Sequence, residues 1–160
     1  WTVMDSAILE TPTGRLHITA TAEHVVAIAW LTSERSIGPT TAPLLIECTA
    51  QLEAYFNSRL KTFSLPLAPA ATIFQNCVRA AMLAIPYGAT ATYGDLARTI
   101  GSGPRAVARG CGANPLPIIV PCHRVVAANA LGGYSGGAGV VTKQRLLTHE
   151  APGVLEFPGP

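Results

Sequence analysis

The sequence contains little charge and no long apolar run. Only 12% of its 160 residues are charged, which is too few for a highly charged coiled coil. A membrane-spanning helix needs roughly 18 apolar residues, and the longest apolar run, Val25 to Leu31, suits only a buried strand. No charged segment followed by an apolar one opens the sequence. We therefore expect no membrane partner and a cytoplasmic location, at the nucleoid if the source is bacterial.

The chain does contain enough apolar material for a packed core, since 49% of its residues are hydrophobic. The formal net charge of +2 is far below that of a dedicated nucleic-acid coat. The placement of charge is more informative, because four arginines and no acidic residue lie between positions 98 and 124. This segment is a candidate for contacts with a few phosphates.

The four cysteines form no C-x-x-C pair, which indicates a reduced protein rather than a disulfide scaffold. Cys48, Cys77 and Cys111 each fall on the apolar face of a predicted helix, so we expect these three thiols to be buried and inert.

A zinc site is a weak alternative. Its candidate ligands are Cys77, Cys111, Cys122 and His123, whose spacing matches no zinc finger or ribbon. Residues 1–70 hold only Cys48, His17 and His24, which make a poor tetrahedral site. We expect no metal and no cofactor.

The pattern predicts two parts, residues 1–70 and residues 71–160. In the first part, alternating segments at 2–9, 15–21 and 25–31 predict an antiparallel sheet, followed by a polar loop at 32–41. Apolar residues then recur at helical spacing: Leu45, Cys48, Leu52, Tyr55, Phe56 and Leu60. A segment with two prolines, 61–72, is predicted to be the linker.

The second part is predicted to be mostly helical. One helix has its inner face at Phe74, Val78, Ala81, Met82 and Ile85, and Pro86 ends it. A capping box at Thr92 and Asp95 begins a short helix to about Ile100. Gly101 breaks that helix, and Pro104 begins another that runs to about Gly112.

The expected fold class is therefore α+β. A small N-terminal antiparallel-sheet part with a helix precedes a mostly helical C-terminal domain, which carries a helix-turn-helix and an active-site cysteine loop.

The predicted helix at 104–112 has an unusual surface. Val107 and Cys111 share the face that should enter the core. The outer face carries two arginines beside very small residues: Arg105, Arg109, Ala106, Gly110 and Ala113. Such a face either packs closely on another helix or enters a DNA groove, with the arginines reaching phosphates or the base stack. The sequence leaves both interpretations open.

Cys122 is the strongest candidate nucleophile. It follows Asn114-Pro115-Leu116-Pro117 and the apolar Ile118-Ile119-Val120, which is expected to be a buried strand or rod. His123 and Arg124 beside it predict an electropositive setting that lowers the thiol pKa. In an extended chain His123 points away from Cys122, so a water would link the two groups. Glu150 could orient His123, although a solvated acid at a helix end is the more common arrangement. A thiol hydrolase would use the same residues, but no oxyanion hole is visible.

These residues resemble the O6-alkylguanine-DNA alkyltransferases, also called methylated-DNA–protein-cysteine methyltransferases. The active-site motif of that family matches Pro121-Cys122-His123-Arg124-Val125. Four further motifs follow the family order: Ile85-Pro86-Tyr87-Gly88 with Thr92-Tyr93-Gly94-Asp95, Arg105-Ala106-Val107 with Asn114-Pro115, Gly133-Tyr134-Ser135-Gly136-Gly137, and Leu146-Leu147-Thr148-His149-Glu150.

The resemblance implies that Cys122 accepts the alkyl group from O6-alkylguanine, with O4-alkylthymine as a second candidate substrate, in double-stranded DNA. It implies that His123 activates the thiol through water, held by Glu150, and that Asn114 braces the turn. Tyr93 would protonate the leaving guanine and help to turn out the nucleotide. Because a thioether has no hydrolytic exit, each molecule would act once.

The family also implies how DNA is bound. Arg105 would fill the gap in the base stack, while Ala106, Arg109, Gly110 and Ala113 would lie at the minor groove. Three residues would contact the lesion base: Val125 through its backbone, Tyr134, and Ser135 near the lesion oxygen. The sequence departs from the family in the longer loop 138–142, which bears on the position of Ser135 and on the size of lesion accepted. It also departs in the tail 151–160, for which we predict no role.

Two alternative functions use the same fold. A lesion-binding protein without repair activity would lack the nucleophile, and Cys122 argues against that function. A helix-turn-helix regulator would need a dimer interface, which nothing in the sequence suggests, so we expect a monomer.

Overall fold

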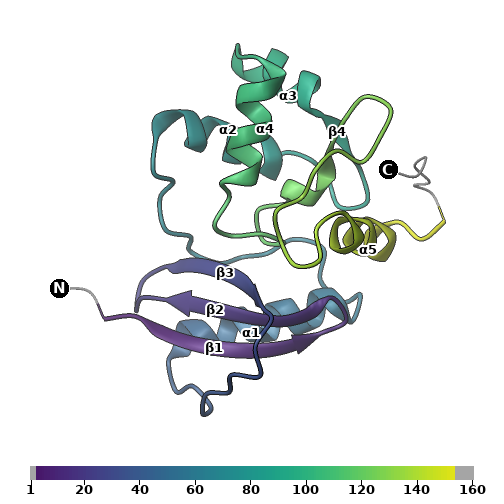
Figure 1. The fold of residues 1–160 in the computed structure, drawn as a ribbon. Helices are drawn as coiled ribbons and strands as arrows, with labels where there is room; N and C mark the ends of the chain where they lie inside the picture. Colours follow the sequence, from purple (N-terminus) through teal and green to yellow (C-terminus); the bar gives the residue numbers. More distant parts are fainter. Residues whose placement is uncertain (1–2, 154–160) are drawn as a thin grey trace. The chain divides into compact units, whose positions relative to one another are not determined.

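The computed structural model describes residues 3–153, and the chain divides into two compact units, 1–68 and 69–160 (Figure 1). The tail at 151–160 lies outside the described residues from position 154 onward. Within residues 3–153, no helix combines the length and apolar content that crossing a membrane requires.

The first unit contains a three-stranded antiparallel sheet. Its strands β1 (Asp5–Thr11), β2 (Gly14–Ala20) and β3 (Val25–Leu31) are ordered β1-β2-β3. The register pairs Leu9 with Leu16 and Ile18 with Ile28, so alternate apolar side chains gather on one face. The predicted sheet is confirmed.

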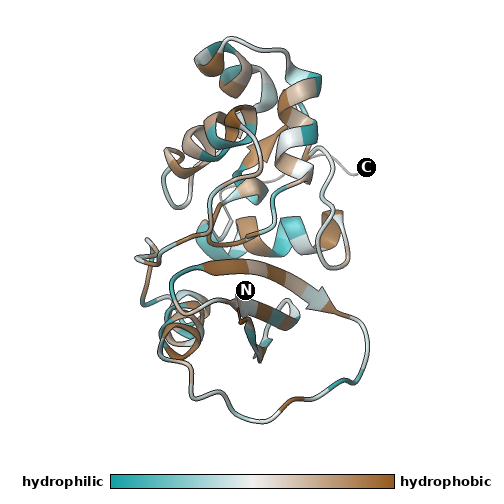
Figure 2. Ribbon diagram, turned by 90° about the vertical axis from the view of Figure 1, so that its left-hand side faces the viewer, coloured by the Kyte–Doolittle hydropathy of each residue, from teal (hydrophilic) through white to brown (hydrophobic). Residues whose placement is uncertain are grey.

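One helix, α1 (Pro43–Phe56), packs against this sheet (Figure 1). Four of the six predicted apolar positions form its fully buried stripe: Leu45, Cys48, Leu52 and Tyr55. Leu60 lies beyond the end of the helix, because the chain already turns at Asn57. The loop that joins β3 to α1 is mostly pale or hydrophilic in Figure 2, as the sequence predicts.

The segment predicted as a linker is partly ordered by the sheet. The Val25 amide donates to the Pro66 carbonyl at 2.8 Å, and the Ala68 amide donates to the Val25 carbonyl at 2.9 Å. These bonds pair the backbone amide and carbonyl of Val25 on the edge of β3 that faces away from β2.

The second unit is mostly helical. Its elements are α2 (Ile73–Leu83), β4 (Ala91–Thr92), α3 (Tyr93–Ile100), α4 (Pro104–Gly112), the 3-10 turn η1 (Cys122–Arg124), β5 (Val125–Val126) and α5 (Val140–Glu150). Together with the antiparallel sheet of the first unit, these helices confirm the predicted α+β class.

The helix-turn-helix has the predicted boundaries. The Thr92 hydroxyl accepts from the Asp95 amide at 3.0 Å, and the Asp95 carboxylate accepts from the Thr92 amide at 2.9 Å. This capping box begins α3, and Gly101 ends it with a φ of 70°. Pro104 is the first residue of α4.

The inner face of α2 is smaller than predicted. Val78 and Met82 are buried, but Phe74 is 37% exposed and Ile85 lies beyond the helix, which ends at Leu83 rather than at Pro86. Cys77 is exposed, so the prediction that it is buried is wrong.

Gly110 lies inside the contact between α4 and α2 rather than on the outer face. It is buried, and a Cβ placed on it would lie 3.0 Å from Val78 Cγ2 and 3.5 Å from Phe74 Cε2. The prediction of a smooth outer face that includes Gly110 is therefore wrong, because α2 approaches so closely that the Val78 side chain would have to move to make room for a Cβ.

The apolar segment before Cys122, predicted to be a buried strand or rod, also differs from its prediction. Residues 118–120 form a buried turn rather than a strand: Ile118 has a φ of 75°, and the Val120 amide donates to the Leu116 carbonyl at 2.9 Å. A positive φ in a β-branched residue is strained and persists only where the surroundings impose it. The last helix, α5, begins at Val140, where the sequence pattern also begins its last helical segment (140–149), so residues 140–142 of the loop 138–142 are helical.

Candidate active site

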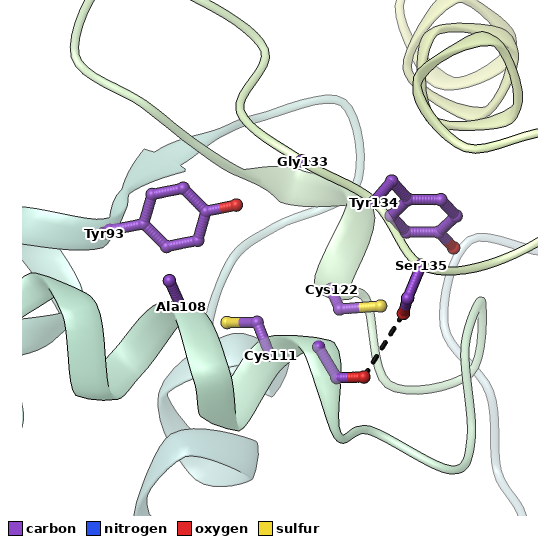
Figure 3. Close-up of a pocket in the computed structure, with 8 residues that line it drawn as sticks. Tyr93, Ala108, Cys111, Cys122, Gly133, Tyr134 and Ser135 are labelled. Atoms are coloured by element: carbon purple, nitrogen blue, oxygen red, sulfur yellow. Dashed lines mark hydrogen bonds between the residues drawn. The ribbon is translucent and has the colours of Figure 1, made fainter.

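A pocket of about 380 Å³ in the second unit exposes the Cys122 thiol (Figure 3). Cys122 is itself only 9% exposed, and it is one of the residues that line this pocket. The lining residues are Tyr93, Ala108, Cys111, Gly112, Cys122, Gly133, Tyr134 and Ser135. A volume of this size is in the range of small-molecule sites.

A short parallel ladder brings two distant parts of the chain to this pocket. Ala91 pairs with Val125 and Thr92 pairs with Val126, so β4 lies beside β5. Tyr93 directly follows β4, and the turn that carries Cys122 directly precedes β5. The pairing therefore places the Tyr93 phenol and the thiol in one pocket.

Gly132 allows Tyr93 to pack closely on the loop after β5. Its φ is 75°, and a Cβ at this position would lie 2.9 Å from Tyr93 Cε2 and 3.0 Å from the Tyr93 hydroxyl oxygen. A side chain at position 132 would therefore displace the phenol, which explains a glycine here.

Asn114 braces the turn before Cys122. Its Nδ2 donates to the Val120 carbonyl at 2.9 Å, and its Oδ1 accepts from the Leu116 amide at 3.0 Å. Its side chain also hydrogen-bonds Cys122, which favours the thiolate and lowers the thiol pKa. This geometry is the one that the resemblance implies for Asn114.

His123 and Glu150 form a buried pair. His123 Nε2 lies 2.7 Å from Glu150 Oε2, and the histidine is fully buried. A carboxylate can only accept, so Nε2 carries the hydrogen and Nδ1 is left with its lone pair. No described residue bonds Nδ1. Burial lowers the pKa of His123, which favours the neutral ring that can act as a base.

Glu150 is buried rather than solvated, with a residue exposure of only 7%. Arg124 Nε donates to Oε1 at 2.7 Å and Nη2 donates to Oε2 at 3.1 Å, while Nη1 donates to the Ile85 carbonyl at 2.8 Å. The Gly88 amide adds a bond to Oε1 at 3.3 Å. Arg124 therefore anchors Glu150, which in turn orients His123.

Lys143 is the functional residue that the sequence analysis missed. It is fully buried, and its Nζ donates to the carbonyls of Val125 at 2.7 Å, Leu131 at 2.5 Å and Gly133 at 3.1 Å. Nζ also lies 5.7 Å from the centre of the Tyr93 ring. The ammonium thus links β5 to the loop that carries Leu131 and Gly133, which we call the pocket loop. Burial lowers the pKa of Lys143 to about 8. A lone lysine in the first turn of an amphipathic helix carries no sequence signal for such a role.

The predicted low pKa of Cys122 is wrong for the free protein. Burial raises the thiol pKa, while hydrogen bonds from Asn114 and Tyr134 and the charge of Lys143 lower it only in part. The neighbouring Arg124 guanidinium, on which the prediction depended, is bound to Glu150 instead. The resting group is therefore a thiol, and its proton must be removed during any reaction.

The two tyrosines of the pocket remain protonated. Burial raises the pKa of Tyr93 to about 12, with smaller contributions from the two pocket cysteines, and burial also raises that of Tyr134. Ser135 lies at the pocket rim, where its hydroxyl donates to the Gly112 carbonyl at 3.2 Å. Val125 is buried and is not among the lining residues, and its carbonyl accepts from Lys143.

The predicted DNA-binding residues lie on a side of α4 that does not line the Cys122 pocket. Arg105 and Arg109 are exposed, as is Ala113 at the end of the helix, and Ala106 is half-buried. A groove of about 530 Å³ between α4 and the start of α2 is lined by Thr72, Phe74, Gln75, Ser102, Ala106, Arg109, Gly110 and Ala113. Gly110 thus forms part of the floor of this groove, and α4 separates the groove from the pocket.

The two remaining cysteines lie on different helices and are not among the residues that line the pocket. Cys48 is buried in α1 and burial raises its pKa to about 12, whereas Cys77 is exposed on α2. Among residues 3–153, no three His, Cys, Asp or Glu side chains come close enough together to hold a metal ion.

The comparisons with known proteins agree with the motifs. Residues 73–152 match the 6-O-methylguanine DNA methyltransferase DNA binding domain, and residues 4–69 match the ribonuclease-like domain of the same enzyme. The chain is 39% identical over 152 residues to a methylated-DNA–protein-cysteine methyltransferase of Methanosarcina acetivorans, with coverage of 90% of this chain and 96% of the relative.

Two solved structures from Mycobacterium tuberculosis have the same fold. The O6-methylguanine methyltransferase superposes with a TM-score of 0.80 at 33% identity, over 94% of this chain and 96% of that one. A structure of the protein OGT in complex with DNA also gives a TM-score of 0.80, at 35% identity over 92% and 95% of the two chains. The resemblance seen in the motifs is confirmed.

Proposed function

The chain belongs to the 6-O-methylguanine DNA methyltransferase family, and we propose that it repairs DNA by moving the alkyl group of O6-alkylguanine onto its own Cys122. The observation that carries this proposal is the pocket, which exposes Cys122 next to a buried His123–Glu150 pair and the Tyr93 phenol. The partner is DNA. A target base inside a duplex can reach this pocket only after it is turned out of the stack.

The chemistry begins with removal of the thiol proton. The Nδ1 lone pair of His123 accepts it through a water molecule, and Glu150 stabilises the imidazolium that forms because Nε2–H remains bonded to Oε2. Arg124 holds the Glu150 carboxylate in place. Lys143 stabilises the developing thiolate through its charge.

The thiolate then attacks the alkyl carbon. A sulfur–carbon bond forms, the bond between carbon and guanine O6 breaks, and its electron pair leaves with the guanine. Tyr93, which stays protonated because of its raised pKa, donates a proton to the guanine. Solvent later reprotonates Tyr93 and removes the proton from His123. The product is a thioether, for which the described residues provide no route of hydrolysis.

The DNA-binding helix in this proposal is α4. Arg105 would enter the base stack and Arg109 would contact the backbone, with Ala106 and Ala113 allowing close approach to the minor groove. Tyr134 and Ser135 would contact the lesion base, together with the backbone at Val125. The protein would act as a monomer where the DNA lies, in the cytoplasm or at the nucleoid, since every proposed group belongs to one unit.

The test is the mass of the protein before and after exposure to duplex DNA that contains O6-methylguanine. We expect one methyl group per molecule, located on Cys122 by peptide mapping. Cys122→Ser should abolish transfer and retain DNA binding, since a serine hydroxyl is far less ionised near neutral pH. A methyl group on another cysteine, or more than one lesion repaired per molecule, would overturn the proposal.

A non-catalytic lesion-binding protein is not favoured as an alternative, because the nucleophile is present and faces the pocket. It would bind O6-methylguanine DNA with unchanged mass, so the same experiment separates the two functions.

A further inference from the structure

The turn between α2 and β4 contacts both members of the buried Arg124–Glu150 pair. Its Ile85 carbonyl accepts from Arg124 Nη1 at 2.8 Å, and its Gly88 amide donates to Glu150 Oε1 at 3.3 Å. Tyr87 lies between these two residues in the chain, and the centre of its ring is 5.7 Å from Cζ of the Arg124 guanidinium. This distance is within the range in which an aromatic ring attracts a cation. The turn therefore offers the pair a carbonyl, an amide and an aromatic ring.

The backbone on each side of Tyr87 fixes the position of its ring. Pro86, which precedes it, has its φ locked by the pyrrolidine ring. Gly88, which follows it, has a φ of 81°, a conformation that glycine adopts at little cost. A Cβ at position 88 would lie 3.4 Å from the Glu150 carbonyl oxygen, so the turn packs directly against the end of α5. Tyr87 is thus carried by a turn that is anchored to the helix that supplies Glu150.

Tyr87 also lies at the boundary between the ion pair and solvent. Arg124 and Glu150 are only 6% and 7% exposed, whereas Tyr87 is half-buried. Burial raises the pKa of Tyr87, the charge of Glu150 raises it further, and the charge of Arg124 lowers it. The phenol thus interacts with both charges. An aromatic ring in this position attracts the guanidinium and keeps water away from the pair.

We propose that Tyr87 is a positioning residue of the repair reaction, whose ring holds the Arg124 guanidinium against Glu150 and thereby keeps His123 oriented to take the thiol proton. This role rests on the proposed function, in which His123 is the base. Tyr87 is not among the residues that line the Cys122 pocket, so it acts through other residues.

The hydrogen bonds of the pair connect the ring to the base. Arg124 donates to both carboxylate oxygens of Glu150, at 2.7 Å to Oε1 and at 3.1 Å to Oε2. Oε2 also bonds His123 Nε2 at 2.7 Å. A guanidinium that loses its contact with the ring can move, and it then shifts the oxygen that orients the imidazole.

Single-turnover methyl transfer from duplex DNA that contains O6-methylguanine tests the ring. Tyr87→Leu should slow transfer by about fivefold, because the attraction between ring and cation is lost and water reaches the pair. Tyr87→Phe keeps the ring and should keep most of the wild-type rate. Phe63→Leu, which removes a half-buried ring from the first unit, is the matched control and should leave the rate unchanged. Equal slowing by Tyr87→Phe and Tyr87→Leu would contradict a role for the ring.

Fluorination separates the electrons of the ring from its shape. Trifluorophenylalanine placed at position 87 has nearly the shape of phenylalanine, so the fold should be kept, but fluorine withdraws the negative charge from the face of the ring. We expect transfer about threefold slower than in Tyr87→Phe. This comparison also decides the question if Tyr87→Leu does not fold. Equal rates would mean that the ring acts only by packing, and would overturn its role toward Arg124.

A double-mutant cycle tests whether Tyr87 acts through Glu150. Glu150→Gln removes the charge that the guanidinium binds, with little change of shape. In that background Tyr87→Leu should slow transfer by less than about twofold, because its effect in the wild type depends on the carboxylate. If the same loss appears in both backgrounds, Tyr87 acts elsewhere and the positioning role fails.

A measurement without DNA separates this role from the proposed function. In the wild type the hydrogen on His123 Nε2 is buried and bonded to Glu150, so its proton NMR signal should exchange slowly with water. Exchange should be faster in Tyr87→Leu and unchanged in Phe63→Leu. Faster exchange in a protein that transfers no methyl group would support the positioning of His123 and contradict the repair function. Normal transfer with one exchange rate in all variants would overturn the role of Tyr87 alone.

Discussion

The ammonium group of Lys143 supplies the positive charge that acts on the Cys122 thiol. It is fully buried, it bonds three carbonyls, and it lowers a thiol pKa that burial raises. Its own pKa of about 8 lies below the ordinary lysine value, since burial disfavours the charged form. The charge is therefore present at neutral pH and is lost as the pH rises through 8.

Replacing this charge should change the pH dependence of repair. We expect Lys143→Met to slow methyl transfer at pH 7 by about tenfold, which corresponds to one unit in the thiol pKa. Above pH 8 the difference should narrow, because the wild type also loses the charge there. Single-turnover rates between pH 6.5 and 9.5 measure this, with the exposed Arg145→Met as control. A constant rate ratio over that range would mean that Lys143 acts only by holding the loop.

Cys77 is the exposed thiol among the four cysteines. We expect it to react first with a small alkylating reagent such as iodoacetamide, while Cys48, Cys111 and Cys122 react more slowly because of their burial. Cys77→Ser should remove the fast phase and leave methyl transfer unchanged. Labelled peptides digested at successive times provide the measurement, and a fast phase that survives in Cys77→Ser would contradict the assignment.

At the scale of elements, α4 packs against three different surroundings and leaves a fourth side exposed. Val107 is in the core, Gly110 touches Val78 of α2, and Cys111 lines the pocket. The exposed arginines occupy the remaining side. Because Gly110 permits the close approach of α2, this helix of nine residues can carry both the proposed DNA contacts and one wall of the pocket.

This arrangement predicts different effects for glutamate substitutions at positions 110 and 113. Gly110→Glu should lower the free energy of unfolding by more than about 2 kcal/mol, because it forces a charge and extra volume against Val78 and Phe74. Ala113→Glu should leave the melting temperature nearly unchanged, since Ala113 is exposed, but should weaken DNA binding through repulsion from phosphate. Thermal denaturation and a DNA-binding titration distinguish the two, and equal stability of the variants would contradict the close contact.

Arg105, near the start of α4, allows a test of base extrusion. Arg105→Ala should slow repair in a duplex more than in a single strand, because only the duplex requires an extruded base and a filled stack. The ratio of the two single-turnover rates is the measurement. Arg145→Ala, on α5, is the control of equal charge, and a similar loss on both substrates would remove Arg105 from the base stack.

For the whole molecule, the formal net charge of +2 limits how strongly DNA is attracted over a distance. In the proposed binding mode the local attraction comes from the helix-turn-helix, where Arg98, Arg105 and Arg109 are exposed. With Arg105 in the base stack, two phosphate contacts, from Arg98 and Arg109, give a slope of about −2 when the logarithm of the binding constant is plotted against that of salt concentration, at about 0.9 per contact. Binding to unmodified duplexes of different sequence at several salt concentrations tests this, and a much steeper slope would require a further basic surface.

The sequence by itself determined the features that depend on neighbours along the chain. The bounds of α3 and α4 follow from Thr92 with Asp95, Gly101 and Pro104, which act within one helical turn. The same holds for β3 and for the buried stripe of α1, where periodicity alone identifies the inner face. The five ordered motifs also identified the family.

Only the tertiary structure decided the electrostatics of that site. Glu150 is buried because Arg124 and Gly88, which are 26 and 62 residues away in the sequence, bond its carboxylate. Lys143 reaches the pocket because α5 places it against the carbonyls of β5 and the pocket loop. The pKa of Cys122 is raised because desolvation depends on everything packed around the thiol, whereas its sequence neighbours suggested the opposite. The desolvation and the electrostatic interactions of a group depend on every atom around it in space. Most of those atoms belong to residues that are distant in the sequence.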